Sequence, residues 1–255
     1  MLRNKSIQFV NIKYSIITTF TFKFLFMLSD IKGIGFDADD TLWENENFFR
    51  ETEAKFEELI KDHTNGHAIV DKLFEIEIGN LDYYGYGIKS FILSMIETAL
   101  KISTKPLDNE LIQQMLDLGK EMMDKPVILI DGIKPVLEIL QKKYTLIVAT
   151  KGDLKDQERK LVKSGLEKYF HHIEVMTDKQ EVNYDKLLKH LNIKASEFFM
   201  VGNSLKSDVI PVLNLGGFGA HIPYYTTWIH EEAEINKSNP SFFSFKKPVE
   251  LLDIL

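Results

Sequence analysis

Short apolar stretches alternate with amphipathic helical segments through the second half of the chain, and this alternation limits the possible folds more than any other feature. Strands that are apolar along their whole length fit a parallel sheet buried between two layers of helices. We therefore predict an α/β fold with a doubly wound, mostly parallel sheet. The expected strands cover 31–36, 144–149, 172–176, 198–201 and 219–222, and the expected helices cover 136–141, 154–164, 183–191 and 209–215.

Three acidic residues, Asp37, Asp39 and Asp40, directly follow the first apolar strand. Clustered carboxylates at the end of a buried strand repel one another and lose hydration unless a cation or a proton is shared among them. A divalent, magnesium-type ion prefers oxygen ligands and supplies that compensation. Because side chains alternate along an extended chain, Asp37 and Asp39 point to the same side. One carboxylate is then placed to attack and the other to move a proton. We expect Asp40 to be structural and to bond nearby backbone.

The stretch between the acidic cluster and the alternating region reads as helical throughout. Helical spacing of apolar residues predicts helices over 44–61, 67–78, 88–102 and 107–123, with no strand among them. This pattern predicts a helical insertion that packs as a bundle. The expected organisation is an extension over 1–26, an α/β core made of 27–43 and 126–255, and a helical domain over 44–125.

Composition and charge exclude several classes of protein. The chain has 255 residues, a formal net charge of −7 and no cysteine. The negative charge disfavours a nucleic-acid partner. The absence of cysteine excludes disulfides and fits a reducing, cytoplasmic compartment. Residues 1–29 contain no acid, but Lys13 and Lys23 interrupt any span long enough for a bilayer. We predict that the first 26 residues are a disordered, dispensable extension with no stable membrane insertion.

Polar residues follow the predicted strands in an order that matches a known set of motifs. The segments D-A-D-D-T-L at 37–42, V-A-T-K-G at 148–152, the isolated Lys179, and V-G-N-S-L-K-S-D at 201–208 resemble the four motifs of the haloacid-dehalogenase-like (HAD) hydrolase superfamily. The resemblance extends from about Ile31 to Ile222. The helical insertion after the first motif is similar to the helical cap of the family's phosphatase branch. The resemblance implies a Rossmann-like core beneath that cap.

The same resemblance implies a role for each of these residues. Asp37 would attack a phosphoryl group and form an aspartyl-phosphate, with Asp39 as general acid and base. Thr150 would bond a phosphoryl oxygen, and Lys179 would offset the charge of nucleophile and phosphate. The implied cofactor is Mg²⁺, and its implied ligands are Asp37, Asp39, Asn203 and Asp208.

Two positions depart from the family pattern. Asn203 stands where aspartate is more common, so the metal site carries one negative charge fewer. Lys151 stands where a small polar residue is common, and it either helps to hold a phosphate or points to solvent. Two further candidates, Tyr86 and Lys89, follow glycines in the loop after the second predicted helix. They either contact substrate or pack within the helical domain.

Some other polar residues are expected to have structural roles. His63 and His67 have the spacing of metal ligands on a helix, but Asn65-Gly66 between them indicates a turn. Trp228 and Glu231 follow the last predicted strand, and we expect them to pack near the sheet edge rather than to line the site.

The function that the sequence predicts is a magnesium-dependent phosphatase acting on a small-molecule phosphomonoester. A phosphomutase of the same superfamily is one alternative, since it shares every core residue. A catalytically silent binding or regulatory module on the same fold is another, supported by Asn203. Asp39 disfavours a carbon–halogen hydrolase, which needs no acid at that position. The sequence predicts neither the substrate nor the oligomeric state.

Overall fold

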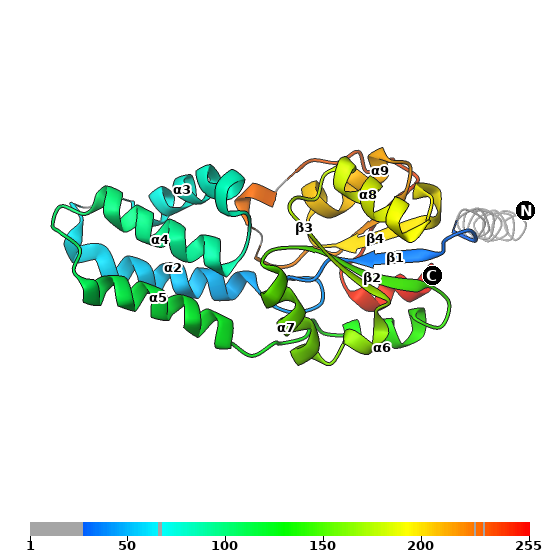
Figure 1. Cartoon of the computed structure of the whole chain (residues 1–255). Coiled ribbons are helices and arrows are strands. Elements are labelled where there is room, and N and C mark those ends of the chain that lie inside the picture. The colour runs from blue at the N-terminus through cyan, green and yellow to red at the C-terminus, as the bar shows by residue number, and fades with distance from the viewer. Residues whose placement is uncertain (1–27, 66–67, 227, 232) are drawn as a thin grey trace, which may run out of the picture.

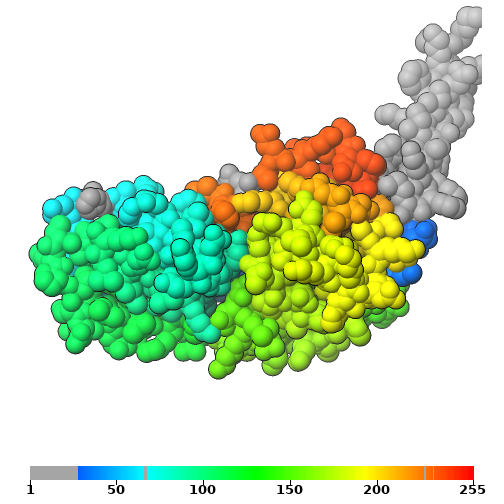
Figure 2. Space-filling model, turned by 45° about the horizontal axis from the view of Figure 1, so that its top comes forward, coloured from blue at the N-terminus to red at the C-terminus, as the bar shows by residue number. Residues whose placement is uncertain are grey.

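The computed structural model describes residues 28–65, 68–226, 228–231 and 233–255. A parallel sheet with flanking helices forms one part of the molecule, and a group of four helices forms the other (Figure 1). Figure 2 shows the two parts as adjoining lobes. The expected extension over residues 1–26 and the expected position of His67 lie outside the described residues. None of the described helices combines the length and the apolar character needed to cross a membrane.

The sheet contains six parallel strands in the order β3-β2-β1-β4-β5-β6. This arrangement confirms the predicted α/β, doubly wound fold. Strand β1 lies between β2 and β4, so its carboxyl end stands at the centre of the sheet edge. The strands are β1 (Gly33–Phe36), β2 (Thr145–Lys151), β3 (His172–Met176), β4 (Phe198–Gly202), β5 (Phe218–His221) and β6 (Phe242–Ser244).

Helices cover both faces of the sheet. One face packs against α6 (Ile133–Leu140), α7 (Leu154–Ser164) and the C-terminal 3-10 helix η6 (Pro248–Asp253), and the other packs against α8 (Glu181–Leu191) and α9 (Ile210–Asn214). Glycine in β1 makes the second face possible. A Cβ atom at Gly35 would lie 2.5 Å from the Phe198 ring and 2.8 Å from Met200 Sδ. The neighbouring strand β4 therefore fills the space that a side chain on β1 would need.

The four helices between β1 and α6 pack around a hydrophobic core of their own. They are α2 (Glu46–Ile60), α3 (Ile69–Tyr84), α4 (Ile88–Ile102) and α5 (Asn109–Asp124). Phe56, Leu73, Met95 and Met115 are fully buried at the centre of this core. Three of the four helices match the predicted ranges to within two residues at each end. We call this group the helical bundle; its exact limits as a domain stay a prediction.

Helix α3 and strand β6 differ from expectation. Gly79-Asn80 was expected to end the second helix, but α3 continues to Tyr84. The Asn80 side chain explains the continuation, because it donates to Ser94 Oγ and Glu97 Oε2 on the neighbouring α4. Tertiary packing therefore outweighs a local stop signal. Strand β6 lies beyond 219–222, the last strand that the sequence predicts, and it forms because the exposed edge of β5 offers a partner.

Candidate active site

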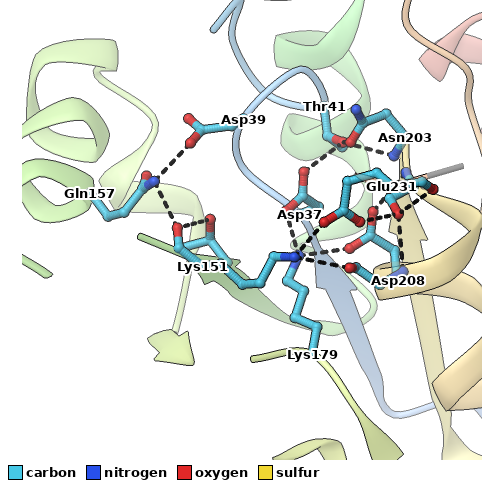
Figure 3. A network of polar contacts seen from close by, with 12 residues as sticks. Asp37, Asp39, Thr41, Lys151, Gln157, Lys179, Asn203, Asp208 and Glu231 are labelled. Atoms are coloured by element: carbon cyan, nitrogen blue, oxygen red, sulfur yellow. Dashed lines mark hydrogen bonds and ion pairs between the residues drawn. The ribbon is translucent and has the colours of Figure 1, made fainter. Parts of the chain in front are cut away.

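Asp37 is the first residue beyond β1, and it is buried in the middle of the sheet edge. Its backbone N–H donates to the Val201 carbonyl of β4 at 2.9 Å, which continues the sheet pairing and fixes the direction of the side chain. The carboxylate accepts hydrogen bonds from Lys179 Nζ and, at 3.0 Å, from Thr41 Oγ1. Asp37 thus stands in the crevice at the strand ends where α/β sheets bind ligands (Figure 3).

Lys179 joins Asp37 to Asp208. The Lys179 side chain is about 1% exposed, and its Nζ donates to both Asp37 Oδ1 and Asp208 Oδ1, the latter at 2.7 Å. Asp208 Oδ2 in turn accepts the Ser204 backbone N–H at 2.9 Å. A Cβ atom at Gly202 would lie 2.1 Å from Asp208 Oδ2, so only glycine leaves room for this carboxylate. The last residue of β4 is therefore shaped around the ion-paired group.

Burial governs the electrostatics of this group. Burial raises the pKa of Asp37 to about 7, although Lys179 opposes the shift; nearby Asp208 adds to the rise. For Lys179, burial favours the neutral amine, but the Coulomb attraction of Asp208 and Asp37 outweighs it and keeps the pKa above its usual range. One buried cation between two buried carboxylates leaves an excess of negative charge.

Asp39 faces away from Asp37 (Figure 3). Its carboxylate accepts hydrogen bonds from Trp43 Nε1 at 2.7 Å, from Gln157 Nε2 at 2.8 Å and from Lys160 Nζ at 2.6 Å. The last two donors lie on α7, and neither was identified from the sequence. Both acids lie at the sheet edge, but the prediction that they point to the same side is wrong, because the Asp39 carboxylate turns toward Trp43 and α7. Asp40 bonds the backbone N–H groups of Asn45 and Glu46, which confirms its structural role.

Thr41 and Thr150 complete the polar surroundings. Thr41 Oγ1 lies 3.0 Å from Asp37 Oδ2 and 3.2 Å from Asn203 Oδ1, and it accepts the Asn203 backbone N–H. Thr41 thereby connects the first motif to the fourth, a link that its position in the sequence did not indicate. Thr150 lies one residue before the end of β2, where it is buried, and it lines the same cavity as Asp37.

A cavity of about 170 Å³ opens between the sheet edge and the helical bundle. Its core wall contains nearly all of the predicted site residues, and its bundle wall contains residues of α2, α3 and α4. The predicted site residues that line it are Asp37, Asp39, Thr150, Lys151, Lys179, Asn203, Asp208 and Tyr86. Lys89 is the exception, because its ammonium pairs with Asp153 at 2.7 Å in an exposed position.

The bundle wall is acidic and aromatic. Glu46, Glu53 and Glu77 line it together with Phe49 and Phe91. Arg50, on α2, pairs with both Glu46 and Glu53. No salt bridge within the described part of the chain involves Glu77, and burial, reinforced by its two acidic neighbours, raises the pKa of Glu77 to about 8. Sequence reasoning missed these acids because they look like an ordinary solvated helix face.

Trp228 and Glu231 also line the cavity, which corrects the expectation that they only pack at the sheet edge. The short 3-10 helix η5 (Ile229–Glu231) lies between α3 and the sheet part in Figure 1. The Trp228 ring contacts the rings of Phe74 and Tyr86 edge-on. In the sequence, the only sign that Trp228 and Glu231 belong to the site is that they follow the last predicted strand.

The donor chemistry at the sheet edge fits a hard divalent cation. Asp37 and Asp208 offer carboxylate oxygens, and Asn203 offers an amide oxygen. Asp39, two residues after Asp37, offers its main-chain carbonyl. Burial, with a further contribution from Asp208, raises the pKa of Asp37 despite Lys179, and an added cation would favour the charged carboxylate. Among the described residues, no three His, Asp or Glu side chains are arranged as a complete metal site, so the fit rests on mixed oxygen donors.

Comparison with known proteins follows the same direction as the geometry. A model of haloacid dehalogenase-like hydrolases matches residues 31–216. A haloacid dehalogenase-like family hydrolase from Xanthomonas campestris is 34% identical, with a TM-score of 0.77 over 86% of this chain and 88% of that one. Comparison with curated proteins gave no match.

Two more distant structures share the fold but differ in the activity that they are named for. One is a predicted phosphoglycolate phosphatase from Haemophilus somnus, 19% identical, with a TM-score of 0.60 over 88% of this chain and 98% of that one. The other is a 2-haloacid dehalogenase from Pseudomonas syringae pv. tomato, also 19% identical, with a TM-score of 0.59 over 88% and 97%. On the family match and the identity to the Xanthomonas structure, the chain belongs to the haloacid dehalogenase-like hydrolases.

Proposed function

We propose that this hydrolase is a magnesium-dependent phosphatase that acts on a small-molecule phosphomonoester. The observation that carries the proposal is the buried Asp37–Lys179–Asp208 group at the floor of a cavity, with a second acid, Asp39, two residues beyond the nucleophile. A dehalogenase would need no acid at the position of Asp39. A group of this kind suits phosphoryl transfer, which depends on positioning and on compensation of negative charge.

The reaction divides into two displacements. An oxygen of Asp37 attacks phosphorus, the ester P–O bond breaks, and the leaving oxygen takes a proton from Asp39. Water then gives a proton back to Asp39 and attacks the aspartyl-phosphate, which releases inorganic phosphate and restores Asp37. Because Asp39 bonds Lys160 and Gln157, its side chain must turn toward the cavity to reach the leaving oxygen.

The remaining residues bind and balance charge. Lys179 offsets the charge of the nucleophile and of the phosphoryl oxygens, and Thr150 donates its hydroxyl to one of them. Asp37, Asn203, Asp208 and the Asp39 carbonyl would hold Mg²⁺, which when bound would supply the positive charge that these residues lack. The helical bundle, expected over 44–125, serves as a cap. Its wall closes the cavity over a small substrate and excludes water.

Replacement of Asp37 by Asn tests the proposal. The variant keeps the shape of the side chain but removes the nucleophilic oxygen, so hydrolysis of an aryl phosphate in the presence of Mg²⁺ should fall by more than about 10³-fold. Asp117→Asn on the exposed surface of α5 is the matched control and should keep full activity. Thermal unfolding of both variants checks that the fold is intact.

Four outcomes would contradict the proposal. Unchanged turnover by Asp37→Asn would show that Asp37 is not the nucleophile. Full activity in excess EDTA would show that the reaction does not need a metal ion. Halide release from a 2-haloacid, without phosphate release from any phosphomonoester, would reassign the chain to dehalogenation. Formation of a phosphate isomer instead of free phosphate would favour the mutase. A panel of phosphorylated metabolites then identifies the substrate.

A further inference from the structure

The Glu231 carboxylate is bound inside the cavity by groups of the core wall. Lys151 Nζ lies 2.5 Å from Glu231 Oε1, and Ser204 Oγ lies 2.6 Å from Glu231 Oε2. The side chains of Lys151 and Glu231 are each only about 13% exposed. A carboxylate far along the chain thus occupies a set of donors at the ends of β2 and β4 (Figure 3).

These donors form a prearranged set. Lys151 Nζ also lies 3.0 Å from Ser207 Oγ, and the Ser207 backbone N–H donates to Ser204 Oγ at 3.0 Å. The Lys151 ammonium stands 4.0 Å from the centroid of the Tyr86 ring, which fixes it from the opposite side. Ser204 and Ser207 are both buried. One ammonium and two hydroxyls that converge in this way make a good receptor for any oxyanion.

The strength of the contact shows in the ionisation of Glu231. Burial alone would raise the pKa of this carboxyl, but Lys151 and the two serine hydroxyls outweigh burial and lower it to about 2. Glu231 therefore stays charged throughout the neutral range. While this ion pair is intact, Glu231 and Ser207 take up two of the three donors of the Lys151 ammonium.

We infer that Lys151, Ser204 and Ser207 form an oxyanion site for the phosphoryl group, and that the Glu231 carboxylate is its internal occupant, which phosphate must displace. The inference rests on the proposed function for the identity of the oxyanion. A phosphate and a carboxylate accept hydrogen bonds from the same donors, so one replaces the other without loss of pairing for Lys151. Glu231 acts as a tethered competitor that lowers the affinity of the resting protein for phosphate.

A different role for Glu231 makes the opposite prediction. If the carboxylate only holds Lys151 in place for phosphate, removal of its charge releases the ammonium and weakens phosphate binding. If it competes, removal of its charge frees the ammonium and tightens phosphate binding. The direction of the change therefore separates the two roles.

Calorimetric titration of the full-length protein with inorganic phosphate, in buffer with Mg²⁺, measures that direction. Glu231→Gln should bind phosphate on the order of tenfold more tightly than the unaltered protein. The reason is that the state in which the Glu231 carboxylate occupies the site no longer predominates. Glu234→Gln, exposed on the same segment, is the matched control and should leave the affinity unchanged. The double variant Lys151→Met/Glu231→Gln should lose the gain and bind phosphate more weakly than Glu231→Gln.

Unchanged or weaker phosphate binding by Glu231→Gln would overturn the inference, as would a gain that persists in the double variant. Glu231→Asp, which keeps the charge but shortens the reach to Lys151, gives the same test if the glutamine variant fails to fold; it should bind phosphate more tightly than the unaltered protein. Aryl phosphate hydrolysis by the unaltered protein is measured in parallel. If the unaltered protein hydrolyses the aryl phosphate but Glu231→Gln binds phosphate no more tightly, only the role of Glu231 as internal occupant is rejected. If Glu231→Gln binds phosphate more tightly but the unaltered protein does not hydrolyse the ester, the phosphatase function is rejected and the oxyanion site stands.

Discussion

The core wall and the bundle wall of the cavity differ in how their carboxylates are paired with cations. On the core wall four acids pair with a lysine: Asp37 and Asp208 share Lys179, Asp39 pairs with Lys160, and Glu231 pairs with Lys151. Asp40 instead bonds the backbone N–H groups of Asn45 and Glu46. On the bundle wall Glu46 and Glu53 share Arg50, and Glu77 has no cationic partner in the described part of the chain. Most acids of the core wall are thus paired with a lysine. On the bundle wall, Glu77 when ionised carries a charge that no salt bridge among the described residues offsets, and we call this the surplus charge of the bundle wall.

This difference separates a chemical role from a binding role. Fixed ion pairs at the strand ends hold reacting groups in place before the substrate arrives, because little reorganisation is then needed in the transition state. The surplus charge of the bundle wall costs stability and does no such positioning. The following four substitutions test whether the two walls differ in this way.

Lys179→Met removes a cation from the core wall, and we expect this substitution to have the largest effect. The change leaves two buried carboxylates without their cation, so the free energy of unfolding should fall by about 3–5 kcal/mol. Aryl phosphate turnover should fall on the order of 10²–10³-fold. Lys189→Met on the surface of α8 is the control for denaturant unfolding and activity. Equal behaviour of the two variants would contradict the central place of Lys179, and Lys179→Arg serves if the methionine variant does not fold.

Gly202→Ala tests the steric side of the same wall. The added Cβ would stand 2.1 Å from Asp208 Oδ2, so Asp208 and its ion pair with Lys179 must shift. We expect a loss of about 1–3 kcal/mol in stability from overpacking, and a loss of up to about 10²-fold in turnover from misplacement. Chemical denaturation and steady-state kinetics measure the two effects. Normal turnover would show that the position of Asp208 is not critical.

Glu77→Gln neutralises the surplus charge of the bundle wall. Burial raises the pKa of Glu77 to about 8, above its usual value near 4.5. Between these two pH values the folded protein holds a proton that the unfolded chain lacks, so Glu77 makes stability fall as pH rises through that window. The variant should be more stable than the unaltered protein by at least about 1 kcal/mol at pH 8, and the gain should shrink toward pH 5.

Glu75→Gln is the matched control for this change, since Glu75 lies exposed on the same helix and pairs with Lys72. Its pH dependence should follow that of the unaltered protein. If Glu77→Gln is no more stable at pH 8 than at pH 5, relative to the unaltered protein, the bundle wall carries no surplus charge and the contrast between the walls disappears.

Gly79→Ala concerns the scaffold of the bundle wall and has the smallest expected effect. Gly79 lies inside α3, and a Cβ atom there would meet no other atom within 4 Å. Alanine should therefore stabilise the helix by about 0.5–1 kcal/mol. Turnover should not change, because the residue is exposed and remote from the ion pairs. A loss of stability would show that the helix needs glycine at this point for a reason that packing does not reveal.

Much of the site could be predicted from the sequence because it lies at strand ends. Asp37, Lys179 and Asp208 each follow a strand of the parallel sheet, and Thr150 lies near the end of β2. Such strand ends meet at one edge whatever the details of packing. The missed residues have no such marker. Lys160 and Gln157 lie within a helix, and Glu77 lies on a polar helix face, where a buried acid and a solvated one have the same local pattern.

The sequence by itself determined the α/β alternation, the helical insertion, and the placement of the motif residues at one edge of the sheet, because these depend on periodicity and on chain order. Only the tertiary structure decided which cation pairs with which acid. It turned Asp39 toward Lys160, placed Glu231 on Lys151, and left Glu77 unpaired. Such pairings join residues that are far apart along the chain, and their distances are set by how the bundle and the sheet pack together.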